Sequence, residues 1–371
     1  MSPALSIAVE ILFIILVSSV VSNFLLPQVS LLAVKKRLFD KTDRRKTHSG
    51  LVPRLGGLVF FPCICATLVL ALLLRHFING YSLLLDTNAI QPLFSLIALL
   101  LLYGVGAADD VFGVRYCYKL AVQLLCGTLI VSSGLYFGNF YGAFGLCELP
   151  QWFACPFTVI VLMLLCNAMN FIDGIDGLAA GITIIVCIYM GTVFLIVTNY
   201  SFGFIAFAAV GTLLPFFYYN VFGNAKRGRK IFMGDAGSLT LGLMLGILAI
   251  KMCQTEQIEQ NTGVNPVVAA MSVLIVPVFD LLRVFIFRIV HHKSPFLPDR
   301  NHIHHRLMSA GLNQHQALIV LLLTTVLFTG LNILLSRYVS ATLIFIADVL
   351  VWAAAHGVVA HAIGKARGAN S

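Results

Sequence analysis

Five short polar segments interrupt a chain that is otherwise mostly apolar, and each of them carries aspartate or histidine. They are AADDV at 107–111, NFIDGIDGL at 170–178, MGDAGS at 233–238, FDLLR at 279–283 and DRNHIHHRL at 299–307. An ionisable side chain next to hydrocarbon costs about 2.5 kcal/mol or more, so it persists mainly where it pairs, binds an ion or faces a water-filled cavity. The five segments therefore predict a polar active site at one membrane face.

The first candidate pair is Asp109 and Asp110, at the end of an apolar run. Neighbours on a helix point about 100° apart, so both side chains can reach one cavity only where the helix ends. Carboxylates are unfavourable at a helix C-terminus, and a pair there suggests a bound cation. The alternative is a boundary marker that only stops membrane insertion.

A second pair, Asp173 and Asp176, is spaced i, i+3, which would place both side chains on one face of a helix. Gly174 and Gly177 follow them directly and would let a ligand approach the backbone. The alternative is an ordinary Asp-Gly turn between two spans.

Asp235 opens a later apolar run within GDAGS, close to a cluster of basic residues at 226–230. As an N-cap it would satisfy free backbone amides. A glycine-flanked helix N-terminus also binds anions, and an aspartate among phosphate-binding groups is best suited to holding a divalent metal.

The histidines His302, His304 and His305 follow Asp299 and Arg300. They do not form the HExxH pattern of a zinc site, and the nearby oxygen ligands suit Mg²⁺ or Mn²⁺. We expect these histidines to bind phosphate oxygens, through hydrogen bonds or as protonated rings, the alternative being a solvated loop.

Asp280 and Arg283 are spaced i, i+3 near the end of an apolar run. A simple intramembrane ion pair and a role in the site are both consistent with this spacing.

Composition identifies the elements that must position these groups. Of the 371 residues, 59% are hydrophobic and 11% are charged, which excludes a soluble globule. A helix that crosses the membrane needs about 20 apolar residues. We expect an all-α polytopic membrane protein with eleven transmembrane helices, the first being an uncleaved anchor. The expected spans are 4–27, 56–78, 91–108, 118–138, 151–170, 178–198, 201–220, 237–253, 264–290, 316–335 and 339–362.

Lysine and arginine predict the orientation, because cytoplasmic flanks retain them. The distribution places the N-terminus outside, in the periplasm, and the C-terminus in the cytoplasm. Residues 1–371 are expected to form a single membrane domain whose site lies at the cytoplasmic face of the membrane. Its basic loops would contact membrane lipids and phosphorylated substrates, and nucleic acid is not an expected partner. The expected cytoplasmic loops are 28–55, 109–117, 171–177, 221–236 and 291–315.

Taken together, these motifs resemble those of a known enzyme family. ADD at 108–110, NFIDGIDGL, FMGDAGS at 232–238, SPFLPDRNHIHHRL at 294–307 and RKTHSGLVPRLGG at 45–57 are similar to the signatures of the polyprenyl-phosphate N-acetylhexosamine-1-phosphate transferase superfamily, also classed as glycosyltransferase family 4. The HIHH sequence and the number of spans resemble the branch typified by WecA and TagO. The short C-terminus departs from relatives that carry a long basic tail.

The resemblance implies transfer of an N-acetylhexosamine 1-phosphate, most commonly GlcNAc-1-phosphate, from a UDP-sugar to undecaprenyl phosphate. The products would be the undecaprenyl diphosphate sugar and UMP, and the step would start an O-antigen, common-antigen or teichoic acid polymer. The implied cofactor is Mg²⁺, with Mn²⁺ as a substitute, and a homodimer is an open expectation. UDP-sugars of QuiNAc, FucNAc and GalNAc are alternative donors.

The residue types and the resemblance together give a set of candidate site residues. The expected metal ligands are Asp109, Asp110 and Asp235. The expected catalytic residues are these three with His302, His304 and His305. The expected substrate-binding residues are Lys46, His48, Arg54, Asn170, Asp173, Gly174, Asp176, Asn220, Asp280 and Arg300.

Three other functions are weighed against this one. A phospho-N-acetylmuramoyl-pentapeptide transferase would use similar motifs but differs in its histidine motif and number of spans. A secondary transporter or channel would place its charges near the bilayer midplane and would contain inverted repeats. An intramembrane metalloprotease would need HExxH, which the sequence lacks.

Overall fold

The computed structural model describes residues 3–36, 52–79, 90–225, 228–292 and 301–368. Within these ranges the structure is almost entirely helical, and an isolated bridge joins Asn139 to Glu148. The helices are α1 Pro3–Lys35, α2 Phe60–Asn79, α3 Ile90–Phe112, α4 Tyr116–Ser132, α5 Gln151–Ile172, α6 Leu178–Ile196, α7 Tyr200–Phe222, α8 Gly234–Cys253, α9 Gln257–Thr262, α10 Pro266–Ser272, α11 Ile275–Val290, α12 Ile303–Ser309, α13 Gln314–Leu335 and α14 Ala341–Gly368.

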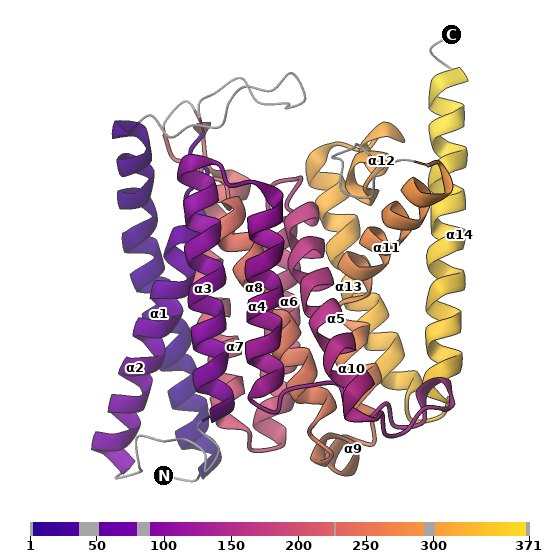
Figure 1. Ribbon diagram of the computed structural model, residues 1–371. Coiled ribbons are helices and arrows are strands. Elements are labelled where there is room, and N and C mark those ends of the chain that lie inside the picture. Colours follow the sequence, from indigo (N-terminus) through magenta and orange to yellow (C-terminus); the bar gives the residue numbers. More distant parts are fainter. Residues whose placement is uncertain (1–2, 37–51, 80–89, 226–227, 293–300, 369–371) are drawn as a thin grey trace.

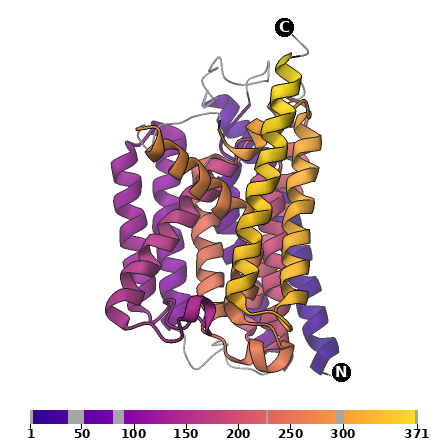
Figure 2. The same cartoon turned by 90° about the vertical axis from the view of Figure 1, so that its right-hand side faces the viewer.

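Nine helices in the described ranges are long and apolar enough to cross a membrane, and α4 is a shorter apolar helix. The expectation of an all-α, multi-pass membrane protein is thereby confirmed. The long helices stand side by side, and the two termini lie at opposite ends of the bundle (Figure 1, Figure 2). Helix α12 lies at the same end as the C-terminus (Figure 1). The number of eleven spans and the direction of the bundle in the membrane stay predictions.

The structure corrects the expected single span over 264–290. This stretch forms two helices, α10 and α11, which are separated at Val273 and Leu274. Pro277 lies in the first turn of α11, where it has no helical hydrogen bond to lose. The second helix is inclined to the long helices (Figure 1, Figure 2). The unbroken apolar sequence hid this division.

The first helix is also longer than expected. We predicted that a loop would begin at residue 28, but α1 continues to Lys35. Residues 11–34 carry no charged side chain, and Lys35 is the first basic residue of the chain. A basic residue is favourable in the last turn of a helix, which is where Lys35 lies. The basic flank used to predict the topology therefore begins on the last turn of α1.

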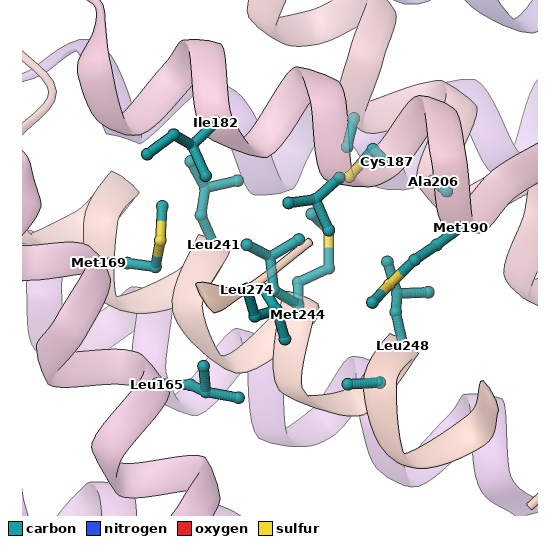
Figure 3. Packing of buried hydrophobic residues seen from close by; sticks show 14 of the residues in the cluster. Leu165, Met169, Ile182, Cys187, Met190, Ala206, Leu241, Met244, Leu248 and Leu274 are labelled. Carbon is teal, nitrogen blue, oxygen red and sulfur yellow. The ribbon is translucent and has the colours of Figure 1, made fainter. Parts of the chain in front are cut away.

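Helix α8 lies at the centre of the bundle and is almost fully buried. Leu165 and Met169 of α5 pack with Leu241 and Met244 of α8 (Figure 3). Glycine permits closer contact: a Cβ atom at Gly242 would lie 2.6 Å from the Cα atom of Cys166. Dense packing of this kind resists displacement, so the first residues of α8 have a rigid support.

A short extended segment is paired with the entrance to α8. The backbone N–H of Phe232 donates to Pro53 O at 2.8 Å, and those of Gly56 and Gly57 donate to Phe232 O and Met233 O at 2.9 and 2.7 Å. This pairing brings the end of the first polar loop, including Arg54, next to the MGDAGS segment.

Candidate active site

Three carboxylates from two helices meet at the start of α8. Asp109 and Asp110 lie in the last turn of α3, and Asp235 lies in the first turn of α8. One oxygen of each carboxylate lies within 4.8 Å of the others, and all three residues are partly buried. Helix α3 can approach α8 this closely because Gly106 has no side chain, and a Cβ there would lie 2.6 Å from the Cα atom of Ala236. The structure thus brings together the three expected metal ligands.

Asp110 binds the backbone of α8 with both of its oxygens. Its Oδ1 accepts a hydrogen bond from the backbone N–H of Asp235 at 2.8 Å, and its Oδ2 accepts from that of Ala236 at 2.9 Å. Asp110 therefore caps α8 from another helix. Gly234 is required at this junction because its φ is +76° and a Cβ would lie 2.6 Å from the Asp110 carboxylate.

Lys119 of α4 bridges the other two carboxylates. Its Nζ donates to Asp109 Oδ2 at 3.2 Å and to Asp235 Oδ2 at 2.7 Å. In the sequence, Lys119 is one of the basic residues that predict the orientation, and no role in the site was expected for it. The sequence did contain a signal for a role in the site. Lys119 lies one turn into the helix that follows the aspartate pair, and a short connection packs this helix, α4, against α3.

Two more groups fix the orientation of the carboxylates. Asn170, at the end of α5, donates to Asp235 Oδ1 at 3.0 Å and to the Ser238 hydroxyl at 2.9 Å. The backbone N–H of Val114 donates to Asp109 Oδ1 at 2.7 Å. Three carboxylates beside one lysine leave an excess of negative charge, and oxygen donors of this kind suit Mg²⁺ or Mn²⁺.

Asp173 follows α5 directly and lies near the carboxylate cluster. Burial raises the pKa of Asp173 well above its usual range, and the nearby carboxylates of Asp176, Asp235 and Asp110 add to the effect. Arg54 acts in the opposite direction on this pKa. The first loop, α5 and α8 therefore contribute to one electrostatic environment. The other two candidates of that loop, Lys46 and His48, lie outside the described residues.

Asp176 and Asn220 brace the loop between α5 and α6. Asp176 forms an ion pair with Lys230, with 2.5 Å between Oδ2 and Nζ. Asn220 is 3% exposed, accepts from the Gly177 N–H at 2.5 Å and donates to Ile231 O at 2.8 Å. Both ends of its amide are used by the backbone. A direct contact of Asn220 with substrate stays a prediction.

The histidine segment lies against this same loop. A Cβ atom at Gly174 would strike the His304 ring, which shows how closely the ring approaches the loop backbone. Burial and the neighbouring His305 and His302 lower the pKa of His304 to about 3, so its ring is neutral. His302 binds Asp280 of α11. Arg300 lies outside the described residues.

These features define a multi-pass membrane protein with a polar site, rich in carboxylates and histidines, at one end of its helix bundle. Residues 92–253 match the family described as glycosyl transferase family 4, and this region includes every carboxylate discussed above except Asp280. The histidine segment follows it in the sequence.

Comparison with curated proteins gives the same family. The undecaprenyl-phosphate alpha-N-acetylglucosaminyl 1-phosphate transferase of Yersinia pestis is 31% identical over 309 residues, covering 82% of this chain and 79% of the relative. The protein of the same name in Escherichia coli strain K12 is 29% identical and covers 81% and 77%. A probable undecaprenyl-phosphate N-acetylglucosaminyl 1-phosphate transferase of Bacillus subtilis is 30% identical and covers 91% and 89%. The chain belongs to glycosyl transferase family 4, as its motifs predicted.

Proposed function

We propose that this protein transfers N-acetylhexosamine 1-phosphate, with GlcNAc as the first sugar to test, from a UDP-sugar to undecaprenyl phosphate. The observation that carries the proposal is the meeting of Asp109, Asp110 and Asp235 within 4.8 Å beside Lys119. The names of the relatives supply the substrate class. They favour this reaction over the phospho-N-acetylmuramoyl-pentapeptide transfer.

The reaction exchanges one phosphate bond for another. An oxygen of the lipid phosphate forms a bond to the sugar-bearing phosphorus, and the bond from that phosphorus to the bridging oxygen breaks. UMP leaves with the bridging oxygen and the electron pair. Such transfers are catalysed mainly by positioning and by neutralising charge on the phosphate oxygens.

The residues at the head of α8 fit a divalent cation. Asp235 and Asp109 would hold Mg²⁺ or Mn²⁺, and Asp110 would support them by fixing the first turn of α8. When bound, the cation would neutralise the charge of the diphosphate. Lys119 carries a fixed positive charge at the same place and is suited to bind a phosphate oxygen as the reaction proceeds.

An apolar pocket among α5, α10, α11 and α14 suits the lipid tail. Its volume is about 410 Å³, and its lining is entirely apolar. Phe279 and Leu282 of α11 line it, while Asp280 of the same helix binds the histidine segment. A polyprenyl chain could therefore stay among hydrocarbon groups while its phosphate reaches the polar site. The residues that line the pocket include Phe157 of α5, Met271 of α10, Phe279 and Leu282 of α11, and Phe345 and Val349 of α14.

We further propose that the site faces the cytoplasm of a bacterial cell, where nucleotide sugars are made, and that the bundle lies in the cytoplasmic membrane. Lys119 pairs with Asp109 and Asp235, and Lys230 pairs with Asp176, so basic residues accompany the carboxylates at this end of the bundle, which supports a cytoplasmic orientation under the positive-inside rule. A transporter is disfavoured because the three carboxylates sit at helix ends rather than near the middle of the bundle.

The direct test is to incubate the purified protein with undecaprenyl phosphate, Mg²⁺ and a panel of UDP-sugars, and to analyse the lipid by mass spectrometry. We expect a lipid diphosphate N-acetylhexosamine and an equal amount of UMP. An Asp235→Asn variant serves as the control and should form neither. If folded wild-type protein forms no such lipid with any UDP-N-acetylhexosamine, the proposed function is wrong.

A further inference from the structure

One carboxylate on α11 holds the histidine segment in place. Asp280 is 2% exposed and accepts three hydrogen bonds. The donors are His302 Nδ1 at 2.8 Å, the backbone N–H of Ile303 at 2.9 Å and Arg283 Nη2 at 3.1 Å. The same Arg283 nitrogen also donates to the carbonyl oxygen of Asn301. A single turn of α11 therefore fixes residues 301–303.

The contact with Asp280 also determines where the His302 ring carries its proton. An ionised carboxylate only accepts hydrogen bonds, so Nδ1 of His302 must be the protonated nitrogen. In the neutral ring, Nε2 then presents a lone pair. His302 is 4% exposed, and its Nε2 has no hydrogen-bond partner within the part of the chain that the structure describes.

Stacking keeps this ring from turning. The His302 ring lies on Phe171 with 5.2 Å between ring centroids and 20° between planes. The His302 ring also stacks with that of His304, at 5.9 Å and 7°. Phe171 precedes Asp173 by two residues, and His304 touches Gly174. Nε2 of His302 is thus held at a fixed place beside the loop that carries Asp173 and Gly174.

His304 adds to the unused hydrogen-bonding groups. It is 1% exposed, and neither of its ring nitrogens has a partner among the described residues. Because its ring is neutral, it offers one N–H and one lone pair. Buried polar groups without partners are costly unless a ligand or water completes them. The wall formed by these two rings suits a neutral ligand with both donors and acceptors.

We propose that Asp280 is a positioning residue that fixes His302 with its proton on Nδ1, so that Nε2 accepts a hydrogen bond from an O–H or N–H group of the donor's N-acetylhexosamine. The inference rests on the proposed function. The diphosphate of a UDP-sugar offers only acceptors in its ionised form, whereas the sugar hydroxyl and acetamido groups offer donors. Asp280 itself does not touch the substrate in this arrangement.

Three substitutions separate the two roles. His302→Asn keeps an amide N–H near the position of Nδ1, which can still bind Asp280, but removes Nε2. His302→Gln places an amide near the position of Nε2. In Asp280→Asn, the new amide oxygen keeps the hydrogen bond from the Ile303 N–H, so the amide NH₂ group points toward His302. Nδ1 of His302 must then accept a hydrogen bond, and the ring proton moves to Nε2. That change replaces the acceptor with a donor.

The test measures the affinity of the full-length protein for UMP and for UDP-GlcNAc by calorimetry. Loss of one hydrogen bond weakens binding by about tenfold. We expect His302→Asn and Asp280→Asn to weaken UDP-GlcNAc binding by this factor and to leave UMP binding unchanged, with partial rescue in His302→Gln. Asp348→Asn is the matched control, because Asp348 is also a buried carboxylate bound to an amide, that of Asn332 at 2.8 Å. It should bind both ligands as the wild type does.

A double variant tests whether Asp280 acts through His302. If it does, Asp280→Asn adds nothing to the loss already caused by His302→Asn. Independent, additive losses would overturn the inference, and so would an equal loss of UMP affinity. If Asp280→Asn does not fold, His302→Asn still tests the role of Nε2. Unchanged affinity of His302→Asn for UDP-GlcNAc would contradict that role. These results are distinct from failure of the proposed function, in which the wild-type protein forms no lipid product.

Discussion

The Asp110 carboxylate lies across the start of α8 and accepts hydrogen bonds from the backbone N–H groups of Asp235 and Ala236, at 2.8 and 2.9 Å. The residue that looked in the sequence like half of a metal-binding pair thus also holds the other helix in place. Asp109, its neighbour, binds Lys119 and the Val114 N–H instead. Adjacent aspartates therefore have different partners and should have different effects when removed.

We predict that Asp110→Ala lowers thermal stability more than Asp109→Ala does. Loss of a helix cap costs about 1 kcal/mol, and Asp110 supplies acceptors for two backbone groups. Melting of the two purified variants in the same detergent measures the difference. Equal melting temperatures would show that Asp110 does not stabilise α8.

Lys119 should be needed for turnover more than for folding. Lys119→Gln removes the positive charge between Asp109 and Asp235, and we expect kcat to fall by about a hundredfold, as when a charge-stabilising donor is lost from an active site. Arg115→Gln is the control, because Arg115 is a nearby exposed cation. Similar rates in the two variants would argue against a role for Lys119.

Asp109 is expected to act by positioning and not as an obligatory base. A phosphate monoester has its second pKa near about 6 and is already mostly dianionic at neutral pH. The Asp109→Asn variant should therefore stay slow at every pH in a rate profile. Full recovery of its rate at high pH would instead show that Asp109 serves to remove a proton.

Asp173 should make stability depend on pH. Burial raises its pKa in the folded protein, so the folded state favours the protonated form, and stability falls as pH rises through that raised pKa. Asp173→Asn removes the ionisation. Without added metal, the substitution should raise the melting temperature more at about pH 8 than at about pH 5. An identical effect at both pH values would contradict the assigned cause.

Much of the site could be predicted from the sequence because the membrane restricts where aspartate can be placed. Asp109, Asp110 and Asp235 were expected at one face, and the structure brings them together. Lys119 was missed because a lysine beside a membrane span is usually explained by topology. The pairing of Asp280 with His302 depends on how α11 packs, which no local pattern reports.

The fold shows the same division between composition and packing. Hydropathy was sufficient to predict a multi-pass helical protein. It could not reveal that 264–290 forms two helices, because the residues on both sides of Val273 are apolar and equally suited to one span. Asn220 was expected to bind substrate, but in the structure both ends of its amide bind the backbone.

The central claim is that Asp109 and Asp235 hold one divalent cation at the start of α8, where Asp110 fixes the backbone. Electron paramagnetic resonance with Mn²⁺ tests it most directly, because free and bound Mn²⁺ give different signals. We predict one bound Mn²⁺ per chain in the wild type, displaced by Mg²⁺, and at least about tenfold weaker binding in both Asp235→Asn and Asp109→Asn, since each removes a charged ligand. Undiminished Mn²⁺ binding in either folded variant would contradict the account.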